Sequence, residues 1–298
     1  MTVARGVRFN LYHRRSAMSV RSVTRRLSSR LVGALLLLAA ATSAGAQDTT
    51  AVGPLFTYRD ALLAGGVVVT ARLIHPLDDW FAEHLQDSST QDSHKLQALA
   101  KFVRTTATPG SGVIGVTMYL AGRVSNNKKL ASLGLHGTEA LVIGEASAAL
   151  LKTLVGRQRP YVTPRNASSY QLMRGRESNA YRSFPSGHSV AAFAAAAAVT
   201  AETSRNDPSS TWYVAPVMYG GAALVGISRM YNNQHWASDV LIGAGIGTFA
   251  GLKVVRFHDS RPHSGLDRFL LTASLVPAPD GGHALRLGVL PAALLGTR

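Results

Sequence analysis

The chain has 298 residues, of which 46% are hydrophobic and 16% are charged, enough for one sizeable domain with an apolar interior. It contains no cysteine, which excludes disulfides and thiolate-bound metals. The formal net charge of +15 would suit a nucleic-acid partner, but the distribution of the basic residues argues against one.

The first 46 residues have the composition of a secretory signal peptide. They contain eight arginines and no acidic residue, and they continue into the apolar run 31–41 and the small residues Ala44-Gly45-Ala46. Without these arginines, 23 basic residues face 16 acidic ones, a net charge of +7. We therefore predict a signal peptide at 1–46, no nucleic-acid partner, and a protein exported to the periplasm or to the periplasmic face of the cell envelope. An uncleaved N-terminal anchor is the alternative.

The next segment, residues 47–260, is predicted to be all-α. It is rich in Ala, Leu and Gly and mostly lacks the alternation of β-branched residues that is typical of strands. The polar run 87–94 is predicted to be a loop. Helices are expected at 60–74, 95–107, 111–123, 133–157, 188–203, 211–228 and 235–256. The predicted fold is thus a helical bundle of about six or more helices.

Few segments of the sequence are long and apolar enough to span a membrane. A span needs about 20 apolar residues, and only the uncharged stretch 208–228 reaches that length, with two prolines in it. The composition favours a bundle that is soluble or partly embedded, and it leaves association with a membrane surface open. In the tail, 261–298, the turn sequence Asp280-Gly281-Gly282 between two apolar runs predicts a short β-hairpin.

Three short motifs carry the candidate chemistry, and the first contains Lys152 and Arg159-Pro160. The two basic residues are seven apart, two turns of a helix, and are expected on one helix face. Pro160 disfavours helix at Arg159, so the helix is expected to end there. An ammonium and a guanidinium suit the several oxygens of a phosphate. Taken alone, they would equally complement a helix dipole.

The second motif is Pro185-Ser186-Gly187-His188, directly before an alanine-rich run. It places free backbone N–H groups at a helix start, which is an anion-binding arrangement. Gly187 lets a ligand come close to the backbone, and His188 is placed to give a proton to a leaving oxygen. An ordinary Ser N-cap beside a surface histidine is the alternative.

The third motif contains Arg229, His235 and Asp239. His235 and Asp239 are four residues apart, which predicts a pair on one helix face. The carboxylate would accept one ring N–H and leave the lone pair of the other nitrogen for a substrate, although such pairs are also purely structural. Arg229 adds another guanidinium for phosphate oxygens. Gly243 and Gly247 continue the four-residue spacing and predict the close approach of a neighbouring helix.

In this order, Lys-x6-Arg-Pro, Pro-Ser-Gly-His and Ser-Arg-x5-His-x3-Asp resemble the signature of the type 2 phosphatidic acid phosphatase (PAP2) and vanadium haloperoxidase superfamily. The resemblance covers roughly residues 130–252. It implies that His235 is the nucleophile, that Asp239 orients it, and that His188 protonates the leaving group. The phosphate-binding residues that it implies are Lys152, Arg159, Ser186, Gly187 and Arg229.

The resemblance implies a metal-independent phosphatase that forms a phosphohistidine, has no cofactor and is inhibited by vanadate. Its substrate would be a phosphorylated lipid, a lipid pyrophosphate or a small phosphomonoester. A vanadium-dependent haloperoxidase is the enzymatic alternative. A non-catalytic envelope protein that binds anionic lipid is the alternative from another class.

Overall fold

The computed structural model describes residues 55–261, 274–277 and 283–286. The predicted signal peptide at 1–46 and the predicted hairpin turn at 280–282 lie outside these residues. Strands β1 (Ser274–Pro277) and β2 (His283–Arg286) pair antiparallel, with Ser274 opposite Arg286, in the tail where the sequence predicts a hairpin. The rest of the described structure is built from helices, which confirms the all-α class.

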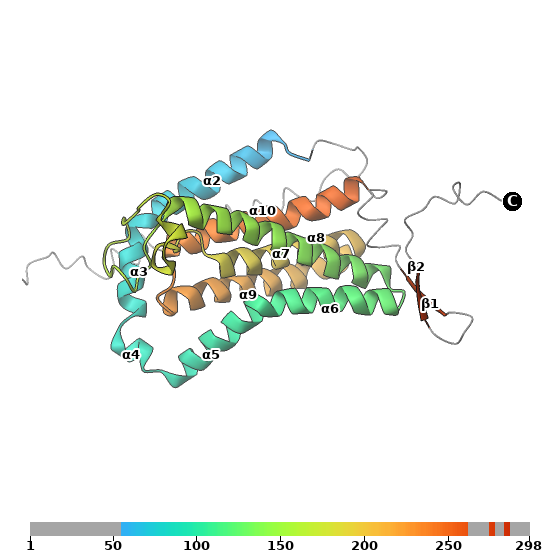
Figure 1. Ribbon diagram of the computed structural model, residues 1–298, viewed down its shortest axis with the longest axis horizontal. Helices are drawn as coiled ribbons and strands as arrows, with labels where there is room; N and C mark the ends of the chain where they lie inside the picture. Colours follow the sequence, from blue (N-terminus) through green and yellow to red (C-terminus); the bar gives the residue numbers. More distant parts are fainter. Residues whose placement is uncertain (1–54, 262–273, 278–282, 287–298) are drawn as a thin grey trace, which may run out of the picture. The chain divides into compact units, whose positions relative to one another are not determined.

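Every predicted helix is present, and the bounds differ from the predicted ones by a few residues (Figure 1). The α-helices are α2 (Tyr58–Ile74), α3 (Asp78–Leu85), α4 (Ser88–Gln91), α5 (His94–Thr105), α6 (Ser111–Val124), α7 (Lys128–Val155), α8 (Gly187–Asn206), α9 (Thr211–Tyr231) and α10 (Ala237–Ser260). Short turns of other helix types are η1 (His75–Leu77), η2 (Thr106–Gly110), η3 (Arg174–Arg176), η4 (Asn179–Tyr181) and η5 (Pro208–Ser210). The prediction of a loop at 87–94 is wrong in part, because the Asp87 carbonyl accepts the N–H groups of Thr90 and Gln91 and closes the single turn α4.

Helix α8 is the central helix of the bundle. It packs against α7, α9 and α10, while α6 packs on α7, α5 on α9 and α2 on α10 (Figure 1). A cluster of buried small and branched side chains joins α7, α8 and α10: Ala140, Ala194, Ala198, Val254 and Val255. Small side chains let these helices approach closely, and this packing fixes the relative positions of the helix ends that carry the motifs.

Helices α8 and α10 approach each other closely, because α10 presents glycines to α8. A Cβ at Gly247 would lie 2.2 Å from the carbonyl oxygen of Val190, and one at Gly243 would lie 2.6 Å from that of Ser186. These distances confirm the close approach that the spacing of small residues predicts. The start of α8, which carries the second motif, is thereby held against the first turns of α10.

Two described segments are long and apolar enough to cross a membrane, Tyr58–Leu85 and Ala237–Ser260. Most of the first segment is unburied, whereas 44% of the apolar window of the second is buried inside the bundle. The uncharged stretch 208–228, which is long enough for a span by sequence, is divided between η5 and α9.

Candidate active site

The first motif begins in the last turn of α7 and continues beyond the helix. Gly156, in the left-handed conformation (φ 60°, ψ 46°), ends α7 at Val155. The prediction that Lys152 and Arg159 share one helix face, with the helix ending at Arg159, is therefore wrong. Arg159 is instead held by the loop that follows: its Nε and Nη2 donate to the carbonyl and side-chain oxygens of Asn179, each at 3.0 Å.

The second motif forms the start of α8, and the first motif reaches it. The Ser186 side chain caps the helix, since its Oγ accepts the Ser189 N–H at 3.4 Å and the Ser189 hydroxyl at 2.8 Å. The first N–H groups of α8, beginning at Gly187, have no acceptor within the helix. The ammonium of Lys152 donates to the carbonyl of Pro185, and its Cε lies 3.5 Å from the position of a Cβ at Gly187. The Ser186 hydroxyl thus serves the cap, and its contact with a phosphate stays a prediction.

His235 lies outside α10, which begins at Ala237. Asp239 is the third residue of α10, and its carboxylate accepts the N–H of Trp236 at 3.0 Å, so the predicted helical pair of His235 and Asp239 is wrong. The His235 Nδ1 lies 2.6 Å from the carbonyl oxygen of Ser183 instead. A carbonyl can only accept, so Nδ1 carries the proton and Nε2 keeps its lone pair. One ring N–H is held by an acceptor, as predicted, but this acceptor is the Ser183 carbonyl and not the Asp239 carboxylate.

Asp239 still supports His235, through one intervening residue. The Ser183 hydroxyl donates to Asp239 Oδ2 at 2.6 Å, while the Ser183 carbonyl accepts from His235. Asp239 also forms an ion pair with Arg157, in which Nη1 and Oδ1 are 2.5 Å apart. Neither Arg157 nor Ser183 was predicted from the sequence as a site residue. Arg157 lies inside the first motif, and this position could have marked it as a site residue. Nothing in the sequence distinguishes Ser183.

Three cations act on the two histidines of the site. Burial, together with the charges of Lys152, Arg159 and Arg229, holds the pKa of His235 well below its usual value. Burial, followed by the charges of Arg229 and Lys152, lowers the pKa of His188 to about 4. Both imidazoles are therefore neutral near pH 7 in the protein without a ligand. Neutral His235, with its Nε2 lone pair, is in the state that a nucleophile needs.

Arg229 has unused hydrogen-bonding capacity. Arg229 is only 5% exposed, and no described residue accepts a hydrogen bond from its Nε or Nη1. Burial and the charges of Arg159 and Arg104 lower its pKa to about 10, so the guanidinium is still charged near pH 7. Unsatisfied buried donors are costly. The arrangement therefore suits an anion with several oxygens, such as phosphate.

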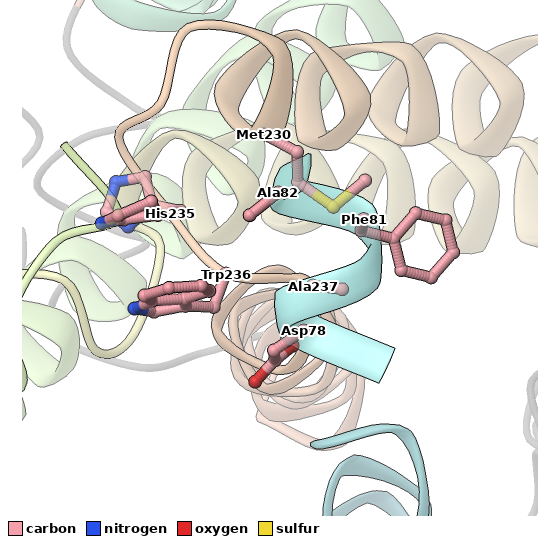
Figure 2. Close-up of a pocket in the computed structure, with 8 residues that line it drawn as sticks. Asp78, Phe81, Ala82, Met230, His235, Trp236 and Ala237 are labelled. Atoms are coloured by element: carbon pink, nitrogen blue, oxygen red, sulfur yellow. The ribbon is translucent and has the colours of Figure 1, made fainter. Parts of the chain in front are cut away.

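The third motif also borders a small cavity, which is lined in part by helix α3 (Figure 2). His235 and Trp236 line it together with Asp78 and Phe81 of α3 and Met230 of α9. Helix α3 thus contributes to the surroundings of His235, which no sequence motif indicates. Within the described residues, no group of three or more His, Asp or Glu side chains is placed to hold a metal ion.

Comparison with known proteins identifies the family. Residues 134–262, which contain all three motifs, match the family described as the PAP2 superfamily. The chain is 44% identical over 87 residues to the lipid A 1-phosphatase of Porphyromonas gingivalis. The aligned part is 29% of this chain and 19% of that protein, so the chain spans about a fifth of the length of this curated relative. A crystal structure of a transmembrane PAP2 type phosphatidylglycerolphosphate phosphatase from Bacillus subtilis is 21% identical, with a TM-score of 0.31, and the match covers 63% of this chain and 94% of that one.

Proposed function

We propose that this protein is an exported, metal-independent phosphatase of lipid phosphates that acts through a phosphohistidine at His235. The observation that carries the proposal is the buried guanidinium of Arg229, with two unpartnered donors beside Lys152 and Arg159. Phosphoryl transfer needs little beyond positioning and charge stabilisation. The cations and the free N–H groups at the start of α8 supply both.

The reaction has two displacements. In the first, Nε2 of His235 attacks phosphorus, the bond from phosphorus to the leaving oxygen breaks with its electron pair on oxygen, and His188 gives that oxygen a proton. In the second, His188 takes a proton from water as the water oxygen attacks the phosphohistidine, and phosphate leaves with His235 restored. Because His188 is neutral in the empty site, its proton enters with the substrate, whose negative charge offsets the surrounding cations and raises the pKa of His188 again.

A lipid substrate is favoured by the surface of the bundle. Both candidate membrane segments belong to helices of the bundle, α2–α3 and α10. Large apolar side chains are exposed along α2, α6 and α9: Leu62, Val68, Val69, Leu73, Val113, Ile114, Leu120, Trp212, Val217 and Leu224. Soluble proteins rarely expose so much apolar surface. We infer that the bundle is held in the membrane, where a lipid can present its phosphate to the site, and the name of the lipid A 1-phosphatase relative supports this substrate class.

A phosphate-release assay tests the proposal. The purified protein in detergent, with excess EDTA, is offered phosphatidic acid, a lipid A phosphate, an isoprenoid pyrophosphate and p-nitrophenyl phosphate, with His235→Ala as the control. We expect turnover that favours the lipids, strong inhibition by vanadate, which can adopt the geometry of the transition state, and no turnover by the variant. Activity that requires added Mg²⁺, or activity that survives in His235→Ala, would contradict the mechanism.

A further inference from the structure

The guanidinium of Arg157, unlike that of Arg159 in the same motif, has no free hydrogen-bond donor for a substrate. It is completely buried. Nη1 donates to Ser238 Oγ at 2.8 Å and to Asp239 Oδ1 at 2.5 Å, and Nη2 donates to Asp78 Oδ2 at 2.7 Å and to the Ala167 carbonyl at 2.6 Å. Nε also donates to the Ala167 carbonyl, at 3.0 Å. All five donors of the guanidinium are therefore used inside the protein.

Two aromatic rings enclose the same guanidinium. Its Cζ lies 5.1 Å from the ring centre of Tyr170 and 5.5 Å from that of Trp236, distances at which a ring face attracts a cation. The rings also keep water away, which strengthens the hydrogen bonds and ion pairs of the guanidinium. Arg157 is thus a rigid anchor for the groups that contact it.

Asp78 is the second carboxylate bound to this anchor. Besides pairing with Arg157, its oxygens accept the Ser238 N–H at 2.8 Å and the Ser238 hydroxyl at 2.5 Å. Asp78 therefore holds the first turn of α10 at the same time as it holds Arg157. It belongs to α3, outside the part of the chain that matches the PAP2 superfamily.

The anchor is connected to His235 through two hydrogen-bonded residues. Arg157 fixes the Asp239 carboxylate, Asp239 accepts the Ser183 hydroxyl, and the Ser183 carbonyl accepts Nδ1–H of His235.

The charges of the cluster also act on His235, because two buried carboxylates face one guanidinium. Asp78 leaves the cluster with a net negative charge, which favours the positive charge that His235 gains when it is phosphorylated.

We propose that Asp78 and Arg157 are positioning residues of the phosphatase reaction, which act through Asp239 and Ser183 to keep His235 oriented with its Nε2 lone pair free. This inference rests on the proposed function, in which His235 is the nucleophile. It adds a residue of α3 to the machinery of the site. It also explains why a fully satisfied arginine lies within a motif whose other cations surround the histidines.

The test compares Asp78→Asn with Glu202→Gln in the full chain. Glu202 is also a buried carboxylate, but it pairs with His136 and Arg205 instead of this cluster. We expect Asp78→Asn to lower kcat roughly 10- to 100-fold, the usual cost of losing an orienting partner, with little change in KM. Vanadate, which can adopt the geometry of the transition state and would then take the His235 nitrogen as a ligand, is expected to inhibit more weakly. Inorganic phosphate, which would need the cations alone, is expected to inhibit as before. A loss of packing would weaken both inhibitors and would appear in Glu202→Gln as well.

Two further measurements keep the proposal falsifiable. Ser183→Ala removes the hydroxyl between Asp239 and the carbonyl that holds His235, so it carries the test if Asp78→Asn does not fold. In isotope-labelled protein, the ring nitrogens of His235, assigned with His235→Ala, are expected to show the Nδ1–H tautomer in the wild type and a mixture in both variants. The inference is overturned if the wild type is active and His235→Ala is inactive, but these variants keep the kcat and the tautomer of the wild type. Activity in His235→Ala would instead overturn the proposed function.

Discussion

Arg229 is expected to destabilise the empty site and to stabilise the occupied one. Two donors of this buried cation have no acceptor among the described residues, and such donors cost about 1–3 kcal/mol each. A buried charge without a counter-charge is costly, and even paired buried charges can often be replaced by apolar side chains of similar volume without loss or with a gain of about 1–4 kcal/mol. We therefore expect Arg229→Met to raise the free energy of unfolding of the ligand-free protein by about 2 kcal/mol. For a domain of this size, that is an increase in Tm of about 4–8 °C.

Thermal denaturation with and without phosphate or vanadate measures both effects. The anions are expected to raise the Tm of the wild type, because they bind the folded state, and to have almost no effect on Arg229→Met. Arg229→Lys keeps the charge but loses the planar fork, so we expect anion affinity to fall about 10- to 100-fold. Arg205→Met is the control, since Arg205 is paired with Glu202 and Asp259. It should gain no stability and should keep the response to the anions.

One combination of results would show that Arg229 does not bind the anion. If Arg229→Met unfolds at a lower temperature than the wild type and is still stabilised by phosphate, the guanidinium supports the fold and does not bind the anion. In that case the unpartnered donors would not mark the phosphate site, and the proposed function would lose the observation that carries it.

Three other predictions concern pH, packing and the intermediate. Burial lowers the pKa of Lys152 to about 8, so the charge of its ammonium is lost as pH rises through that value, and kcat/KM should fall there. In Lys152→Arg the fall in kcat/KM should move above about pH 10, because arginine titrates above 12. Gly247→Ala, whose Cβ would lie 2.2 Å from the Val190 carbonyl, should destabilise the fold by about 1–3 kcal/mol in urea denaturation, whereas Gly220→Ala, which meets nothing within 4 Å, should not. Alkaline denaturation followed by mass spectrometry should find phosphate on His235, and the configuration at phosphorus should be retained; inversion would exclude the covalent step.

The helices and the motifs could be predicted from the sequence because their signals are local. The apolar composition indicated the helices, and the spacing of Gly243 and Gly247 indicated the close approach to α8. The errors arose where two local signals competed. Gly156 and Pro160 both indicate a helix end, and the glycine ends α7 because it adopts the left-handed conformation. Asp239 at the third position of α10 caps the helix start, which leaves His235 outside it.

The contact between Asp78 and Arg157 could not be predicted because it joins distant parts of the chain. Asp78 lies 79 residues before Arg157 and 160 before Ser238. In the sequence, an aspartate at the start of α3 looks like any acidic residue in a first helical turn, where it favours the helix dipole. Its complete burial is a result of tertiary packing alone. A single sequence contains no periodicity or spacing that reports such a contact.

The positions of the cations follow from the helix ends that meet at the site. Helices α8 and α10 present their N-termini, whose partial positive charge favours an anion. Helices α7 and α9 present their C-termini, which would repel an anion, but their last turns carry Lys152 and Arg229. The two side chains therefore reverse the unfavourable potential of their own helices. Burial, together with this positive potential, lowers the pKa of both His188 and His235. In the proposed reaction, burial and the same charges that would bind the phosphate keep His235 neutral until the substrate arrives.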